Sequence, residues 1–169
     1  MIILGIDPGF GRLGYAVIKS EKNDIQVIEC SCLETSSKQK HEKRLILIAD
    51  KIKELLLKYR PQTLALEKIF FAKNQKTALQ VAEIRGILLY LAASSGIPVC
   101  EYGPLEVKMA ICGYGKAAKD QVGKMIKILL KLQSLPKSDD AVDALAISLT
   151  CAACLPTGQA SLPASQKFK

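Results

Sequence analysis

The stretch MIILGIDPGF, residues 1–10, combines a buried strand with an abrupt polar stop. Its apolar run predicts a strand over residues 2–7, which ends on Asp7 and the Pro-Gly pair that follows. Asp-Pro-Gly is ordinary turn chemistry, because proline fixes φ and glycine supplies a positive φ. A carboxylate at the carboxyl end of a strand is also a position at which α/β proteins build their sites. This segment alone leaves both interpretations of Asp7 open.

The rest of the chain predicts a mixed α/β sheet covered by helices. Three β-favouring segments, residues 2–7, 14–19 and 25–34, predict an antiparallel meander that ends in a polar connection over 36–44. The helices and strands expected after it are a helix over 45–59, a strand over 63–66, a helix over 77–93, a strand over 97–102, and helices over 104–112, 120–132 and 139–155. We expect one domain over residues 1–155. Residues 156–169, rich in Pro, Ser, Gly and Gln, predict a flexible tail.

Composition narrows the class of protein. The 169 residues are 49% hydrophobic, which is enough for one packed domain, and no apolar run approaches the ~20 residues of a membrane span. The first residues do not resemble a signal peptide, so we expect a cytoplasmic protein. The six cysteines lack zinc-site spacing and the one histidine, His41, lies in a polar stretch, which favours reduced, structural thiols. The net charge of +8 favours a polyanionic partner, nucleic acid or an anionic membrane surface, over a merely basic surface.

Two acids occupy equivalent places in the pattern. Asp7 and Glu67 are each the first charged residue after a short strand that looks buried. If these strands are parallel neighbours, both carboxylates emerge at the same edge of the sheet, where open α/β sheets form their sites.

The last predicted helix carries further acids in the stretch SDDAVDALA, residues 138–146. Asp143 shares a helix face with Asp140, three residues before it, and also with Asp139, four residues before it. A favourable interaction with the helix dipole explains Asp139 well but explains Asp143, which lies past the first turn, poorly. Spacing alone does not choose between Asp139 and Asp140.

Carboxylates that converge in one cleft repel one another unless cations bind between them. A cluster without histidine or thiolate favours a hard cation, Mg²⁺ or Mn²⁺. Two such ions about 3.5–4 Å apart can activate a water and stabilise the leaving oxygen of a phosphodiester. Together with the positive net charge, the acids therefore suggest a nuclease, in which lysines hold phosphates and acids hold metals.

An ordered set of motifs then resembles one family, the crossover junction endodeoxyribonuclease RuvC family. The matching motifs are GIDPG at 5–9 with Gly14-Tyr15, ALEKIF at 65–70 with AKN at 72–74, Arg85-Gly86, YGPLEVK at 102–108, GYGKAAKDQV at 113–122 and DAVDALA at 140–146. Each motif is weak alone, but they run in order over nearly the whole chain. The resemblance implies a ribonuclease-H-like mixed sheet, with three antiparallel strands and then parallel strands, flanked by helices.

The resemblance also implies a function. It implies a homodimer that resolves Holliday junctions in homologous recombination and DNA repair, by paired nicks in strands of like polarity. The implied cofactor is Mg²⁺, two ions per site, with Mn²⁺ as a substitute. The implied partners are four-way junction DNA and a branch-migration helicase complex (RuvA and RuvB). Within the dimer, small residues make helix 77–93 our candidate contact, although packing on its own sheet explains them equally well.

The resemblance assigns roles residue by residue. The implied catalytic and metal-binding acids are Asp7, Glu67, Asp140 and Asp143, which leaves Asp139 as a residue of the helix start. Lys108 and Lys119 match lysines placed near the scissile phosphate and the junction backbone, and Phe70 matches an aromatic that stacks on an unpaired base. From the sequence alone, a core position for Phe70 is the alternative.

The chain departs from the family pattern at a few positions. Phe10 and Gly11 stand where a small hydroxyl residue and an arginine are frequent, and Ala16 replaces a frequent glycine. Lys68 follows Glu67, where it either perturbs metal binding or points away. Two rival functions remain: an RNA-processing nuclease of the same fold, and a junction-binding module that no longer cuts. An actin-like ATPase would need two such domains, for which 169 residues leave no room.

Overall fold

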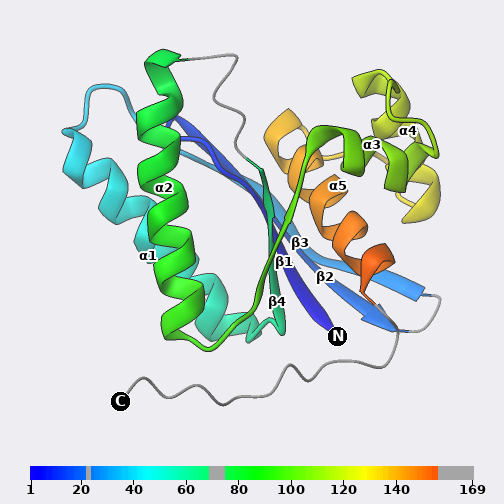
Figure 1. Ribbon diagram of the computed structural model, residues 1–169, viewed down its shortest axis with the longest axis horizontal. Coiled ribbons are helices and arrows are strands. Elements are labelled where there is room, and N and C mark those ends of the chain that lie inside the picture. Colours follow the sequence, from blue (N-terminus) through cyan, green and yellow to red (C-terminus); the bar gives the residue numbers. More distant parts are fainter. Residues whose placement is uncertain (22–23, 69–74, 156–169) are drawn as a thin grey trace.

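The computed structural model describes residues 1–21, 24–68 and 75–155, which form a five-stranded sheet between two layers of helices (Figure 1). The strands are β1 (Ile2–Asp7), β2 (Arg12–Glu21), β3 (Asp24–Glu34), β4 (Thr63–Glu67) and β5 (Val99–Tyr102). Their order across the sheet is β3-β2-β1-β4-β5. Pairing is antiparallel from β3 through β2 to β1 and parallel from β1 through β4 to β5. This confirms the predicted mixed sheet of three antiparallel and then parallel strands.

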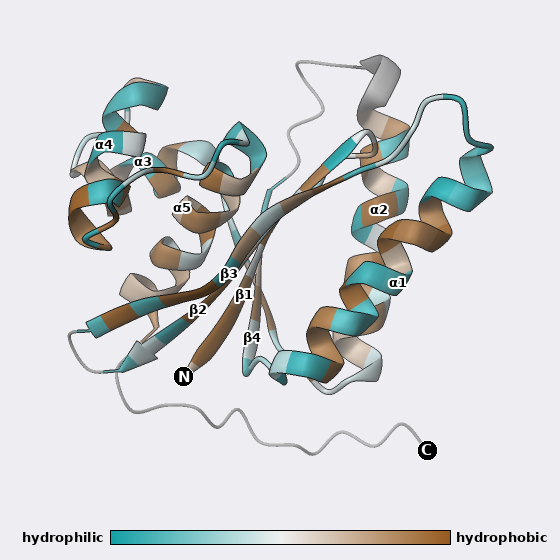
Figure 2. Ribbon diagram, turned by 180° about the vertical axis from the view of Figure 1, so that it is seen from behind, coloured by the Kyte–Doolittle hydropathy of each residue, from teal (hydrophilic) through white to brown (hydrophobic). Residues whose placement is uncertain are grey.

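The helices lie on both faces of the sheet. They are α1 (His41–Tyr59), α2 (Gln75–Ser94), α3 (Pro104–Cys112), α4 (Lys119–Leu129) and α5 (Asp139–Cys154). Helices α1 and α2 cover one face, and α3, α4 and α5 lie on the other (Figure 1). Figure 2 shows the largely hydrophobic strands between these two layers.

Side chains along β1 divide between two hydrophobic cores, because successive residues of a strand point to opposite faces. Leu4 and Ile6 are buried with residues of α1 and α2, whereas Ile3 is buried with residues of α5. Asp7 continues this alternation on the α5 face. The strand therefore both anchors the sheet and decides toward which helix layer its terminal carboxylate points.

Some element boundaries differ from those predicted. Helix α1 begins at His41 and not at residue 45, because its first turn is polar and exposed and so carries no apolar period. Helix α4 ends at Leu129, three residues earlier than predicted, and Lys131 then has a positive φ of 51°. The predicted tail, residues 156–169, lies outside the described residues. None of the described helices combines the length and apolarity that a membrane crossing requires.

Candidate active site

Strand register brings the first two acids together. Strands β1 and β4 are parallel neighbours, with Ile6 opposite Leu66, so Asp7 and Glu67 are the next residues of the two strands. Ala65, two residues before Glu67, belongs to the core on the α5 face, as Ile3 of β1 does. Both carboxylates therefore leave the same edge of the sheet toward the same helix layer, as predicted from the sequence.

Two glycines allow α5 to approach this edge closely. Gly14 of β2 lies directly opposite Asp7, and a Cβ atom at Gly14 would lie only 2.0 Å from the backbone carbonyl oxygen of Asp140. A Cβ atom at Gly5 would lie 2.5 Å from the carbonyl oxygen of Ala144. Any larger residue would push the helix away from the sheet. Glycine at these positions thus sets the height at which α5 presents its acids above β1 and β2.

The electrostatics of the site follow from this convergence. Burial raises the pKa of Asp7 from its ordinary value of 3.8 to about 7, and the nearby negative charges of Glu67, Asp143 and Asp140 contribute to the rise. The pKa of Glu67 is also raised, first by burial and then by Asp143. All four predicted acids therefore lie close enough to interact. Because these carboxylates repel one another, positive charge at this edge of the sheet would stabilise their ionised forms.

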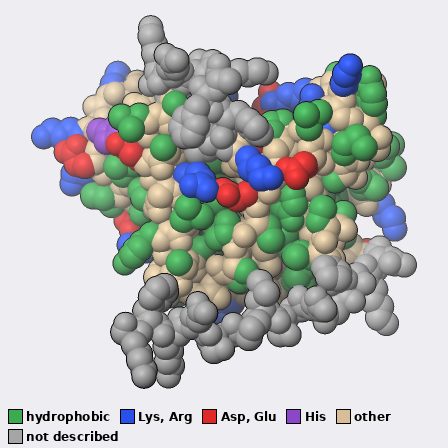
Figure 3. All heavy atoms as spheres, in the orientation of Figure 1, with side chains coloured by type: hydrophobic (Ala, Val, Ile, Leu, Met, Phe, Trp, Pro, Cys, Tyr) green, Lys and Arg blue, Asp and Glu red, His purple; other side chains and the backbone are tan. Residues whose placement is uncertain are grey.

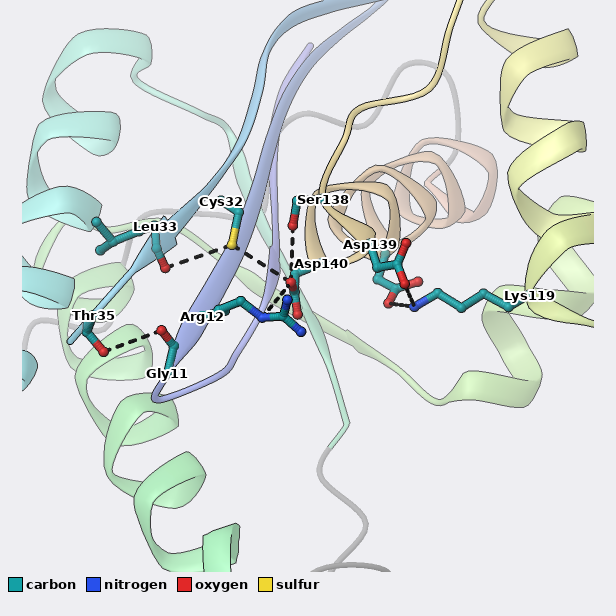
Figure 4. A network of polar contacts seen from close by, with 10 residues as sticks. Gly11, Arg12, Cys32, Leu33, Thr35, Lys119, Ser138, Asp139 and Asp140 are labelled. Carbon is teal, nitrogen blue, oxygen red and sulfur yellow. Dashed lines mark hydrogen bonds and ion pairs between the residues drawn. The ribbon is translucent and has the colours of Figure 1, made fainter. Parts of the chain in front are cut away.

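Two basic residues already supply part of that charge from opposite sides (Figure 4). The Lys119 Nζ atom lies 3.0 Å from Asp143 Oδ2 and 3.5 Å from Asp139 Oδ2. The Arg12 Nε atom lies 3.2 Å from Asp140 Oδ2. Burial lowers the pKa of Lys119, but its hydrogen bonds and ion pairs with Asp143 and Asp139 outweigh that effect and raise it overall.

A cavity of about 250 Å³ opens beside the acids. Glu67 and Asp143 line it together with Lys108 and Lys119, so the structure brings both predicted lysines to the acidic edge. Lys119 is the first residue of α4, so this helix begins one residue before its predicted start at residue 120. The loop ends at Ala118, whose backbone is extended, and the helix begins at the next residue.

The donor set of this site suits a hard cation, because every candidate ligand is a carboxylate. Within the described residues, however, no three such side chains already surround one point as ligands of an ion. Lys119 and Arg12 occupy one oxygen each of Asp143 and Asp140. The chemistry of the residues fits a divalent ion, and the two basic side chains are the charges with which that ion would have to compete.

One known protein family matches most of the chain. Residues 3–151 match the family described as crossover junction endodeoxyribonuclease RuvC. The chain belongs to the RuvC family.

Individual relatives agree over most of their length. A crossover junction endodeoxyribonuclease RuvC from Natranaerobius thermophilus is 44% identical over 149 residues, which cover 88% of this chain and 92% of the relative. One from Pseudothermotoga lettingae is 47% identical over 148 residues, covering 88% and 91%.

Solved structures of the RuvC family share the fold. The Thermus thermophilus RuvC structure superposes with a TM-score of 0.85 and 35% identity, covering 90% of this chain and 94% of that one. Thermus thermophilus RuvC in complex with a Holliday junction substrate gives a TM-score of 0.84 and 34% identity, covering 89% and 92%. The ribonuclease-H-like fold expected from the resemblance is therefore that of a RuvC protein.

The neighbouring acids Asp139 and Asp140 differ in their surroundings. The Asp140 side chain is 19% exposed and accepts a hydrogen bond from the Ser138 hydroxyl at 3.1 Å. The Asp139 side chain is 76% exposed, and Lys119 is its ion-pair partner. Asp140 is thus held against the sheet, as the RuvC resemblance implies for a site acid, while Asp139 lies at the rim.

Two of the departures from the RuvC pattern, Lys68 and Phe10, have structural explanations. The Lys68 Nζ atom lies 3.1 Å from Glu106 Oε2 of α3, so Lys68 is paired away from the acids. Phe10 is buried, and the Arg44 guanidinium lies 3.8 Å from the centre of its ring. Arg44 also donates a hydrogen bond to the Phe10 carbonyl at 3.1 Å. Packing between Phe10 and Arg44 therefore closes this side of the turn after Asp7.

One predicted site residue lies outside the described residues, and one residue that contacts the site was not predicted. Phe70, predicted to stack on a base, lies outside the described residues, and its role stays a prediction. Arg12 contacts Asp140 but was not among the predicted site residues. Its only signal in the sequence is a basic residue shortly after the Asp-Pro-Gly turn. The six cysteines are free thiols, as expected.

Proposed function

We propose that this RuvC-family chain is a Holliday junction resolvase that nicks two DNA strands of like polarity symmetrically, in homologous recombination and repair in the cytoplasm. The observation that carries the proposal is the convergence of Asp7, Glu67, Asp140 and Asp143 at one sheet edge, beside Lys108 and Lys119. The likeness to a RuvC solved with a Holliday junction supports the same substrate. Residues 1–155 would act as one nuclease domain.

The four acids would hold the cofactor. Their all-carboxylate chemistry fits two Mg²⁺ ions, with Mn²⁺ as a substitute. When bound, such ions supply an activated water and charge stabilisation for the leaving oxygen of the cut phosphodiester. The raised pKa of Asp7 supports this role, because burial and the neighbouring carboxylates both disfavour its ionised form, and a bound divalent cation would offset both effects.

The chain's other residues would bind and orient the DNA. Lys108 and Lys119 line the same cavity as Glu67 and Asp143, which supports a role in binding phosphates on either side of the cut. The net charge of +8 favours binding of the negatively charged DNA backbone. Phe70 follows β4 by three residues, and we assign it the stacking of one unpaired base at the junction centre.

A homodimer would give the paired cuts their symmetry, because a two-fold axis relates two identical sites. Helix α2 is our candidate interface. Its Leu79 and Tyr90 side chains are each 71% exposed, and Gly86 leaves open space between them on the helix. Hydrophobic side chains are spread over the face that carries α2 (Figure 3). The proposed dimer would act together with the RuvA and RuvB branch-migration helicase.

The decisive experiment incubates the protein with a synthetic four-way DNA junction, with and without Mg²⁺. We expect symmetric nicks only with Mg²⁺, and none from Asp7→Asn, Glu67→Gln, Asp140→Asn or Asp143→Asn, although these variants still bind the junction. Asp139→Asn is the matched control, because its side chain lies at the exposed rim and should be dispensable.

Several outcomes would contradict the proposal. Preferential cleavage of structured RNA would favour an RNA-processing nuclease. Junction binding without cleavage by the wild-type protein would favour a binding module. A dead Asp139→Asn variant with an active Asp140→Asn variant would exchange the roles assigned to the two neighbouring acids.

A further inference from the structure

Arg12 lies beside the acids but has no role in the function proposed above. It opens β2, shortly after the turn that displays Asp7, and its side chain is 59% exposed. Alternation along β2 places it on the same face as Gly14, against which Asp140 packs. The turn itself is tight, since a Cβ atom at Gly9 would lie 2.1 Å from the Arg12 carbonyl oxygen. Arg12 is therefore held beside the acids by the same backbone that holds Asp7.

The contacts of Arg12 separate it from an ordinary surface ion pair. Its Nε atom lies 3.2 Å from Asp140 Oδ2, and the Ser138 hydroxyl donates to the same oxygen at 3.1 Å. The Cys32 thiol also approaches this oxygen, at 3.9 Å. Ser138 and Cys32 thus contact the same Asp140 oxygen as Arg12 does. What Arg12 alone contributes is a positive charge next to a proposed metal ligand.

The arrangement of charges suggests where this guanidinium binds once DNA arrives. Arg12 approaches the acids from β2, and Lys119 approaches them from α4 on the opposite side (Figure 4). A DNA strand that crosses the acids must pass both cations. Guanidinium groups bind phosphate oxygens in a bidentate manner, and an exposed arginine can exchange one anionic partner for another at little cost.

We infer that Arg12 is a phosphate-binding residue of this site and that, without DNA, it occupies Asp140 in competition with the divalent ion. The inference rests on the proposed function and deepens it. DNA binding would draw Arg12 from Asp140 to a phosphate and remove a cation from the neighbourhood of the metal. Junction and metal would then each favour the binding of the other, as linked ligands do.

The test uses Arg12→Gln in the full chain, because glutamine keeps a hydrogen-bond donor and removes the charge. Two quantities are measured: Mn²⁺ affinity of the free protein by calorimetry, and junction affinity against salt concentration in EDTA. We expect Mn²⁺ to bind about three- to tenfold more tightly. We expect the junction to bind more weakly, with a salt slope reduced by roughly one. A purely structural defect would weaken both.

Lys19→Gln is the matched control, because Lys19 lies at the other end of β2 and pairs with Glu21. It should change neither quantity, and thermal melting verifies that both variants fold. Weaker Mn²⁺ binding by Arg12→Gln would show that Arg12 orients Asp140, and an unchanged salt slope would show that it does not touch a phosphate. Either result overturns the inference. Failure of the wild-type protein to bind junction or Mn²⁺ would instead refute the proposed function.

Discussion

Asp7→Asn should make the metal-free protein more stable than wild type at alkaline pH while it abolishes cleavage. Burial and the neighbouring carboxylates disfavour the charged form of Asp7, which raises its pKa from 3.8 to about 7. At about 1.4 kcal/mol per pKa unit, this rise corresponds to a cost of about 4 kcal/mol for holding the ionised group in the native state. Asparagine has almost the same shape and carries no such cost.

The direction of the pKa shift determines the pH range over which Asp7 lowers the stability of the protein. A carboxyl group with a raised native pKa binds its proton more tightly when folded, so wild-type stability falls as pH rises from about 4 to about 7. Above that window the loss is complete. The advantage of Asp7→Asn should therefore reach about 4 kcal/mol at pH 8 and shrink to about 1 kcal/mol at pH 4.5.

Urea unfolding of both proteins in EDTA, at pH 8 and pH 4.5, measures this difference directly. Saturating Mg²⁺ at pH 8 should narrow the gap, because only the wild-type protein retains a complete set of metal ligands and gains stability by binding. If Asp7→Asn is no more stable than wild type at pH 8 in EDTA, neither burial nor the neighbouring carboxylates disfavour the ionised form of Asp7 in the native state. The case for a metal site at this edge would then lose its electrostatic basis.

Three further substitutions test separate parts of the structure. Gly14→Ala should cost several kcal/mol of stability and abolish cleavage, because the new methyl group would lie 2.0 Å from the Asp140 carbonyl oxygen. Gly11→Ala is its control: the new methyl group would lie 3.9 Å from Arg44, so this variant should have the melting temperature of wild type. Lys119→Ala should weaken junction binding and lower the salt slope by roughly one, and an unchanged slope would mean that Lys119 serves only its carboxylate partners. Phe70→Ala should slow cleavage of a fully paired junction more than it weakens binding, and a junction with unpaired central bases should restore it, since stacking contributes roughly 1–3 kcal/mol per base. A lowered melting temperature without such rescue would identify Phe70 as a core residue.

The fold was predictable because its signals are local and periodic. The apolar run before Asp7 and the one before Glu67 mark two buried strands, and parallel pairing brings their ends together without further information. The start of α1 was missed because a polar first turn such as His41-Glu-Lys-Arg has no apolar period.

The finer geometry of the site depends on contacts between elements that are distant in the sequence. Which of Asp139 and Asp140 faces the sheet depends on the rotation of α5, and that rotation depends on how closely the helix approaches Gly14. No spacing within the helix contains this information, and resemblance to a family had to supply it. Arg12 and Asp140 lie far apart in the sequence, and no periodic pattern around either residue predicts their ion pair.

The dependence of the acidic edge on α5 also has a consequence for biosynthesis. Asp7 and Glu67 leave the ribosome well before Asp140 and Asp143, and translation at roughly 5–20 residues per second separates the first acid from the last by on the order of ten seconds. During that interval the face of β1 that α5 will cover, including Ile3, has no helix against it. A nascent chain thus carries two of the four site acids and an uncovered apolar face. It completes its acidic edge and covers this face of the sheet in the same step, when α5 docks.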